Sequence, residues 1–161
     1  RTVVFRHSSM YGGRQFSTVD QGWVGWFCEQ ALRIQAGGVP PTLQISGSGN
    51  QVRDLLHAED MIQLYRSVIT HIDQARGQAF NIGGGMENSL SLLELFNLLQ
   101  EMLGIEFSVD KLNARPSDQK VFVADLTKAG QLLEWKPEVN AKDGITRMLS
   151  WIKDTKMRKT V

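Results

Sequence analysis

Three consecutive glycines follow a short apolar strand pattern in the segment NIGGGMENSLSLLEL, residues 81–95. Strand, glycines and helix in this order are typical of a loop that binds the phosphates of a dinucleotide. The full pattern is G-x-G-x-x-G, but Asn88 occupies the position of the third glycine. The helix also begins late, at Ser91, so its first amides do not point into the glycine turn. We therefore interpret glycines 83–85 as a close connection between strand and helix.

Metal and redox chemistry have little support in the sequence. The three histidines, His7, His57 and His71, and the single cysteine, Cys28, do not have the spacing of a zinc site, so we expect no metal. His57 directly precedes an apolar-periodic segment, and we interpret it as a helix cap. A single cysteine cannot form an internal disulfide, which favours a cytoplasmic location.

The composition is that of an ordinary globular protein. The 161 residues are 42% hydrophobic and 22% charged, which argues against disordered, collagen-like and disulfide-scaffold classes. The net charge is +1, and only the end of the chain, KDTKMRKTV, is clearly basic, so we expect no nucleic-acid partner. The apolar runs are too short to span a bilayer, so we expect no membrane association. Because the chain starts at Arg1 and enters a strand pattern at once, we expect it to be a piece of a longer protein.

The periodicity of apolar residues predicts an α/β protein with short strands. Strands or extended segments are expected at 2–5, 42–45, 51–57, 79–82, 105–109 and 121–124. Helices are expected at 21–35, 58–73, 91–103 and 141–154, with a short helix capped by Asp125. The Gly- and Ser-rich segment 7–22 is predicted to be a long loop, which is often functional. Ser91 and Glu94 form an S-x-x-E capping box.

Several motifs, taken in order along the chain, resemble the extended short-chain dehydrogenases that act on nucleotide sugars. These are RHSSMYGGRQ (6–15), ISGSGNQVRDLLHAEDM (45–61), the glycine passage, ARPSDQKVFVAD (114–125) and LLEWKPEV (132–139). The resemblance implies the C-terminal portion of such an enzyme, with the last Rossmann strands and a small substrate-binding α/β domain. Residues 1–161 would then form the substrate-binding part, without the N-terminal NAD-binding Rossmann part.

Within this family, residues 6–27 are most similar to the CDP-paratose 2-epimerases. That resemblance implies a cytoplasmic isomerase of lipopolysaccharide O-antigen biosynthesis that inverts C2 of CDP-paratose to give CDP-tyvelose. NAD would be a recycled cofactor bound mainly by the missing part, and the full-length enzyme would be a homo-oligomer. Two alternatives remain. One is part of a 4-epimerase or 4,6-dehydratase acting on UDP, GDP or dTDP sugars; the other is a non-catalytic nucleotide-binding module.

The family uses a Tyr-x-x-x-Lys pair for proton transfer. Tyr11 is followed four positions later by Gln15, and Tyr65 by Ile69, so neither tyrosine has the lysine. By resemblance, the catalytic pair lies upstream of this chain. We therefore predict no catalytic residue here, and we expect the chain alone to be inactive.

Five residues match positions that bind the substrate in the family, namely Arg53, Arg115, Asp118, Gln51 and Ile45. The two arginines suit a diphosphate, because the guanidinium fork can give two charge-assisted hydrogen bonds. Asp118 matches an acidic residue turned toward the nucleotide, while Gln51 and Ile45 lie near the expected base pocket. Plainer interpretations are a surface salt bridge at Arg53, a turn at Asp118 and ordinary core at Ile45.

Two residues match positions near the cofactor. By resemblance, His7 and Ser9 border the nicotinamide and the sugar, although His7 replaces a commoner proline. A lone histidine near a strand end is also often a hydrogen-bonded structural residue. Trp23, Trp26 and Phe27 are expected in the core or an interface, with one of them able to face the sugar.

Overall fold

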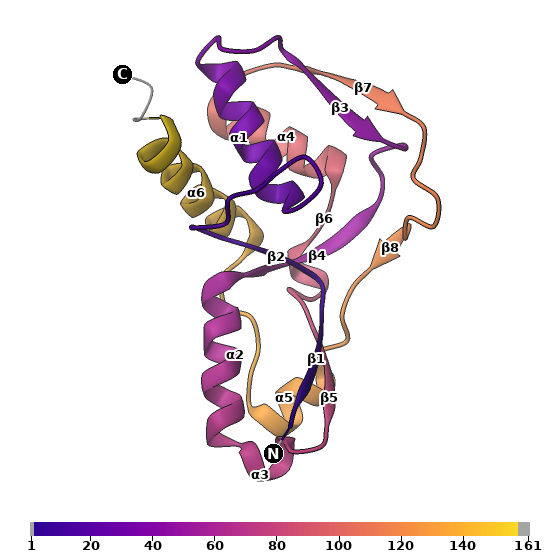
Figure 1. Ribbon diagram of the computed structural model, residues 1–161, viewed down its shortest axis with the longest axis vertical. Helices are drawn as coiled ribbons and strands as arrows, with labels where there is room; N and C mark the ends of the chain where they lie inside the picture. Colours follow the sequence, from indigo (N-terminus) through magenta and orange to yellow (C-terminus); the bar gives the residue numbers. More distant parts are fainter. Residues whose placement is uncertain (1, 158–161) are drawn as a thin grey trace.

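The computed structural model describes residues 2–157 of the chain, so the last residues of the basic segment 153–161 lie outside the described part. Figure 1 shows an elongated molecule, in which helices gather at both ends and strands cross the middle. None of the helices in the described part combines the length and apolar character that crossing a bilayer requires.

Short strands and helices alternate along the chain, as the sequence predicts. The strands are β1 Val4–His7, β2 Ser9–Tyr11, β3 Thr42–Ser46, β4 Val52–His57, β5 Ala79–Ile82, β6 Ser89–Ser91, β7 Ser108–Leu112 and β8 Val121–Phe122. The helices are α1 Trp23–Gln35, α2 Ala58–Thr70, α3 Ile72–Ala75, α4 Leu92–Leu103, α5 Thr127–Leu133 and α6 Ala141–Ile152. A 3₁₀ turn (η1, Met86–Asn88) precedes β6, and a π-helical turn (η2, Lys153–Met157) extends α6. The α/β class is therefore confirmed.

Three small sheets organise the strands. β1 pairs in parallel with β5, and β3 pairs in parallel with β7. β4 is the centre of the third sheet, where it pairs in parallel with β2 and β8 and antiparallel with β6. Because β4 contacts three strands that are distant from one another in sequence, it fixes the relative positions of the segments that surround it.

The hydrophobic core has two parts, and β4 contributes to both. One cluster packs α1, α4 and α6 against β3, and it contains Leu55. The other packs α2 and α5 against β5, and it contains Leu56. Successive side chains of a strand point to opposite faces, so the adjacent leucines of β4 enter different clusters. In Figure 1 these clusters correspond to the upper and lower groups of helices.

The glycines after β5 allow a close approach of backbone to β4. A Cβ atom on Gly83 would lie 1.9 Å from Oδ2 of Asp54, and one on Gly84 would lie 2.0 Å from the carbonyl oxygen of Leu55. The same Asp54 oxygen accepts hydrogen bonds from the backbone amides of Gly85, at 3.1 Å, and Ala124, at 3.0 Å. The interpretation of the glycines as a close connection is confirmed, and its physical reason is the buried Asp54 carboxylate.

Asn88, which occupies the third glycine position, joins this loop to α6. Its side-chain amide donates to the carbonyl oxygen of Gly84, and its side-chain oxygen accepts from the backbone amide of Ala141. The predicted capping box is also confirmed. The Ser91 hydroxyl accepts from the amide of Glu94, and the Glu94 carboxylate accepts from the amide of Ser91. These two hydrogen bonds explain why α4 begins well after the glycines.

Four details differ from the sequence prediction. Segment 7–22 is not entirely loop, because Ser9–Tyr11 forms β2 against β4. Ser89–Ser91 forms an unpredicted strand, β6. The predicted helix 58–73 is broken at His71, whose backbone amide and ring both contact the Ser67 carbonyl, so α3 is a separate turn. The predicted strand 105–109 is shifted to β7, because the amide of Phe107 bonds to the Gln100 side chain instead of a strand.

Candidate functional site

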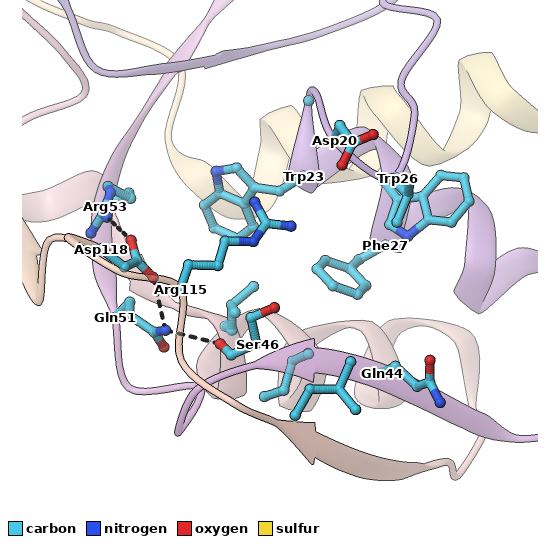
Figure 2. A pocket seen from close by; sticks show the side chains of 15 residues that line it. Asp20, Trp23, Trp26, Phe27, Gln44, Ser46, Gln51, Arg53, Arg115 and Asp118 are labelled. Atoms are coloured by element: carbon cyan, nitrogen blue, oxygen red, sulfur yellow. Dashed lines mark hydrogen bonds and ion pairs between the residues drawn. The ribbon is translucent and has the colours of Figure 1, made fainter.

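A cavity of about 360 Å³ lies between the start of α1, the end of β3 and the segment that joins β7 to β8. Its volume is within the usual range for small-molecule sites, roughly 300–1,000 Å³. Figure 2 shows aromatic side chains of α1 on one side and a group of polar side chains from β4 and the β7–β8 segment on another. The cavity therefore offers both an apolar wall and a set of hydrogen-bonding groups.

The aromatic wall comes from one helix. Trp23, Trp26 and Phe27 lie on neighbouring turns of α1, and all three line the cavity. The Trp23 indole N–H donates to the Ser9 hydroxyl at 3.0 Å, which holds the ring against β2. Phe27 packs edge-on against Phe96 of α4, with ring centroids 4.8 Å apart. The wall is thus fixed by contacts behind it, and flat rings of this kind can stack on a nucleotide base.

The polar group is a connected network around Asp118. One carboxylate oxygen accepts from the Arg53 guanidinium at 3.0 Å, and the other accepts from the Gln51 side-chain amide at 3.0 Å. The Gln51 amide also donates to the Ser46 carbonyl oxygen, and its side-chain oxygen accepts from the amide of Gly49. Gln51 therefore ties together β4, the turn after β3 and the β7–β8 segment.

Arg115 is the unpaired cation of the cavity. Its side chain is exposed, and Figure 2 shows it extending over the cavity. Within residues 2–157, no hydrogen bond or ion pair engages its guanidinium. Asp20 also lines the cavity, but it is drawn beside Trp26, apart from Arg53. The unengaged guanidinium of Arg115 therefore gives the cavity a group that suits an anion.

All five predicted substrate-binding residues line this cavity: Arg53, Arg115, Asp118, Gln51 and Ile45. The plainer structural interpretations of three of these residues are also correct. Arg53 does form an ion pair with Asp118, the Asp118 amide closes a turn onto the Arg115 carbonyl, and Ile45 is 3% exposed. The side chains of Arg53 and Asp118 are 20% and 29% exposed, and such a pair contributes only about 0–1 kcal/mol to stability. Their roles in binding remain predictions.

The two residues predicted near the cofactor do not line the cavity. Ser9 contacts it only through its hydrogen bond to Trp23. His7 ends β1, and its Nδ1 atom is buried without a hydrogen-bond partner in the described structure. Burial lowers the pKa of His7 below its ordinary value, which favours the neutral ring. A buried, unsatisfied ring nitrogen fits a hydrogen bond to a bound group, so His7 is compatible with a cofactor contact.

Several cavity residues were not singled out from the sequence. They are Val19, Asp20, Gly22, Gln44, Ser46, Leu92 and Leu112. The first three belong to segment 7–22, whose length was the available signal of a functional role. The others come from strand ends and a helix start that only strand pairing brings together, so no local pattern marks them.

The remaining candidates for chemistry are structural. Tyr11 is 1% exposed and donates to the Ala141 carbonyl, and burial raises its pKa well above the ordinary value. Burial also raises the pKa of the Cys28 thiol, to about 12. His57 caps α2 by accepting from the Glu59 amide, as predicted. In the described residues, no group of three or more histidine, cysteine or acidic side chains could hold a metal ion.

Known proteins resemble this chain over nearly its whole length. The profile of the family described as GDP-mannose 4,6 dehydratase matches residues 1–148. A CDP-paratose 2-epimerase from Salmonella typhi is 57% identical over 150 residues, which are 93% of this chain and 44% of that protein. The chain therefore spans less than half the length of this relative.

Two solved structures share the fold. UDP-glucuronic acid 4-epimerase from Bacillus cereus, in complex with UDP-glucuronic acid and NAD, has a TM-score of 0.79 and 26% identity, covering 94% of this chain and 45% of that one. UDP-glucose 4-epimerase from Thermotoga maritima, with UDP-glucose, has a TM-score of 0.79 and 27% identity, covering 94% and 46%. The predicted fold, a portion of an extended short-chain dehydrogenase, is confirmed.

Proposed function

Because this chain belongs to the GDP-mannose 4,6 dehydratase family of extended short-chain dehydrogenases, we propose that it is the substrate-binding part of a nucleotide-sugar epimerase. The proposed reaction of the whole enzyme is inversion of C2 of CDP-paratose to give CDP-tyvelose. The level of identity to the Salmonella typhi protein, 57%, favours this reaction over those of the more distant relatives. Residues 1–161 are the C-terminal part in this proposal, with an NAD-binding Rossmann part preceding them.

The observation that carries the proposal is the composition of the cavity. A nucleotide sugar presents a planar base, a ribose and a diphosphate. Arg115 extends over the cavity with its guanidinium fork unengaged, and Arg53, which pairs with Asp118, also lines the cavity. The aromatic residues of α1 offer flat surfaces beyond them. Charge-assisted hydrogen bonds to the diphosphate and stacking on the base would together orient the sugar for reaction.

NAD is part of this proposal because the Bacillus cereus relative contains it. When bound, NAD supplies the hydride chemistry of the family. On this chain, His7 offers its buried Nδ1 as one hydrogen-bonding atom, while Ser9 holds Trp23 in place. The proton-transfer pair, Tyr-x-x-x-Lys, is assigned to the part outside this chain, so the chain alone is expected to be inactive. A cytoplasmic homo-oligomer is proposed for the full-length enzyme.

A second candidate is a UDP-sugar 4-epimerase. It is favoured by the two solved structures with UDP sugars, although their identity to this chain is only 26–27%. A competition series with CDP, UDP, GDP and dTDP separates the two candidates. CDP is expected to bind most tightly, and a series in which UDP ranked first and CDP last would support the second candidate. Binding without turnover in the full-length protein would instead indicate a non-catalytic module.

The test of the site uses Arg53→Ala and Arg115→Ala. Hydrogen bonds to charged groups contribute about 1.5–3 kcal/mol each, so each variant should bind CDP roughly ten- to a hundred-fold more weakly. Arg115→Lys should restore affinity only in part, because lysine keeps the charge but loses the fork. The measurement is calorimetric titration of the chain with CDP.

Arg33→Ala is the matched control for these variants. Arg33 belongs to α1, the helix whose start lines the cavity, but it pairs with Glu29 and does not line the cavity. Its loss should leave CDP affinity unchanged. If Arg53→Ala and Arg115→Ala also bind CDP like the wild type, they are ordinary surface charges. If both melt far earlier without ligand, their role is structural.

A further inference from the structure

The segment between β7 and β8, residues 113–120, carries Arg115 over the cavity with few attachments of its own. Every residue in it is exposed. Backbone hydrogen bonds anchor the chain at the two ends, from Gly47 to the Leu112 carbonyl and from Val52 to the Lys120 carbonyl. Between these anchors, Asp118 is the only residue of the segment whose side chain forms a hydrogen bond or ion pair with the rest of the described structure.

Asp118 is held by two side chains that are themselves fixed. Gln51 is bound on both sides of its amide, to Ser46 and Gly49, before it donates to Asp118. Gly47 leaves the space for this arrangement, because a Cβ there would lie 2.6 Å from Nε2 of Gln51. Arg53 is held by its own hydrogen bond to the Val52 carbonyl. The contacts of Asp118 therefore connect an exposed segment to the start of β4.

The backbone around Asp118 transmits this attachment to Arg115. The Asp118 amide donates to the Arg115 carbonyl at 3.3 Å, which closes a turn between the two residues. Ser117, inside that turn, has a φ of 62°, in the left-handed region that a non-glycine residue adopts only when its surroundings require it. Holding the Asp118 carboxylate therefore also sets the position of the Arg115 backbone.

We propose that Asp118 is a positioning residue for diphosphate recognition, acting by holding the 113–120 segment so that Arg115 lies over the cavity. The inference rests on the proposed function, because it takes the ligand's diphosphate to bind at Arg115. It goes further by assigning Asp118 a role that needs no contact with base or ribose. Affinity for a diphosphate that lacks both groups should then depend on Asp118.

Simple electrostatics predicts the opposite sign. Removing a carboxylate beside an anion site lowers the repulsion felt by the ligand, so a through-space effect alone would strengthen anion binding. Weaker binding after loss of Asp118 therefore identifies positioning. Asp20 offers a matched comparison, because it lines the same cavity but makes no contact with Gln51 or Arg53 in the described structure.

The experiment is calorimetric titration of the chain with inorganic pyrophosphate at constant ionic strength. Asp118→Ala is expected to weaken binding, by as much as the roughly ten- to hundred-fold expected for Arg115→Ala. Asp20→Asn, which removes the same charge, should bind as well as or better than the wild type. If Asp118→Ala has a lower melting temperature than the wild type, Asp118→Asn replaces it, because asparagine retains the shape of the side chain. Its pyrophosphate affinity is then compared with that of Asp20→Asn. Equal or tighter pyrophosphate binding by both Asp118 variants overturns the proposal.

The double variant tests whether Asp118 acts through Arg115. If it does, Asp118→Ala should cause no further loss of pyrophosphate affinity in an Arg115→Ala background, whereas independent contributions would add. An additive loss overturns the proposal. A wild-type chain that binds CDP but not pyrophosphate also overturns it and leaves the proposed function intact. A chain that binds neither overturns both.

Discussion

Replacing Gly83 by alanine should destabilise the protein strongly without any ligand present. The new Cβ would lie 1.9 Å from Oδ2 of Asp54 and 3.0 Å from Cβ of Ala124. Asp54 is fully buried, so its carboxylate cannot move out into solvent. To reach ordinary van der Waals contact, the carboxylate or the loop must shift by more than about 1 Å. That shift disrupts the close packing of the glycine loop against β4 and the hydrogen bonds that Asp54 accepts.

The size of the effect follows from the hydrogen bonds at risk. Oδ2 of Asp54 accepts from the Gly85 and Ala124 amides, at 3.1 and 3.0 Å. Losing two hydrogen bonds to a charged group costs about 3–6 kcal/mol, at about 1.5–3 kcal/mol each. For a domain of this size, the melting temperature should fall by roughly 6–24 °C, taking about 2–4 °C per kcal/mol.

Thermal and urea unfolding, followed by circular dichroism, measure this prediction. Gly130→Ala is the control, because it lies in α5, where an added Cβ meets nothing closer than 3.9 Å. That variant should be as stable as the wild type or slightly more stable, by up to about 1 kcal/mol. A Gly83→Ala protein that melts with the control would refute the role given to Asp54. If such a stable Gly83→Ala protein bound NAD more weakly than the wild type, the glycines would instead be a cofactor-binding loop.

Two further predictions concern the ends of helices. Burial lowers the pKa of His57, so the unfolded chain takes up a proton that the folded chain does not, and stability should fall as the pH drops below 6.5. His57→Asn keeps an acceptor for the Glu59 amide and should weaken the pH dependence of the free energy of unfolding. Urea unfolding between about pH 7.5 and about pH 5 measures this dependence. If the variant shows the same dependence as the wild type, other groups cause it. Ser91→Ala should remove the cap of α4 and lower the free energy of unfolding by roughly 0.5–2 kcal/mol, measured by urea unfolding; an unchanged value would contradict the cap's importance.

Local signals in the sequence predicted most of the helices. Apolar residues at helical spacing marked α1 and α4, and Ser91 with Glu94 marked the start of α4. These patterns succeed because a helix closes its backbone hydrogen bonds within a few residues, and its caps lie beside it in sequence. The order of motifs also identified the family and five of the residues that line the cavity. Such motifs consist of residue types at fixed spacings, so the sequence alone is enough to find them.

The short strands depended on tertiary structure. Ser9–Tyr11 and Ser89–Ser91 are only three residues long, too short for a side-chain pattern to predict a strand, and they are strands because each pairs with β4. β7 likewise occupies 108–112 because its register with β3 continues past the apolar run. The hydrogen-bond partners of a strand are backbone groups of residues that are distant in sequence. Any residue type except proline carries both backbone groups, so the side-chain pattern alone does not predict where such a short strand forms.

The arrangement of the site was also decided by the tertiary structure. The sequence placed Arg53, Arg115 and Asp118 in one binding site, but it did not pair Asp118 with Gln51 or leave Arg115 as the unengaged cation. These relations arise where β4 and the 113–120 segment meet, more than sixty positions apart along the chain. A side-chain hydrogen bond forms only at short range and with the right direction. The motif resemblance therefore predicted which groups line the cavity, while the fold determined which of them hydrogen-bond to each other and which one stays unengaged in the described structure.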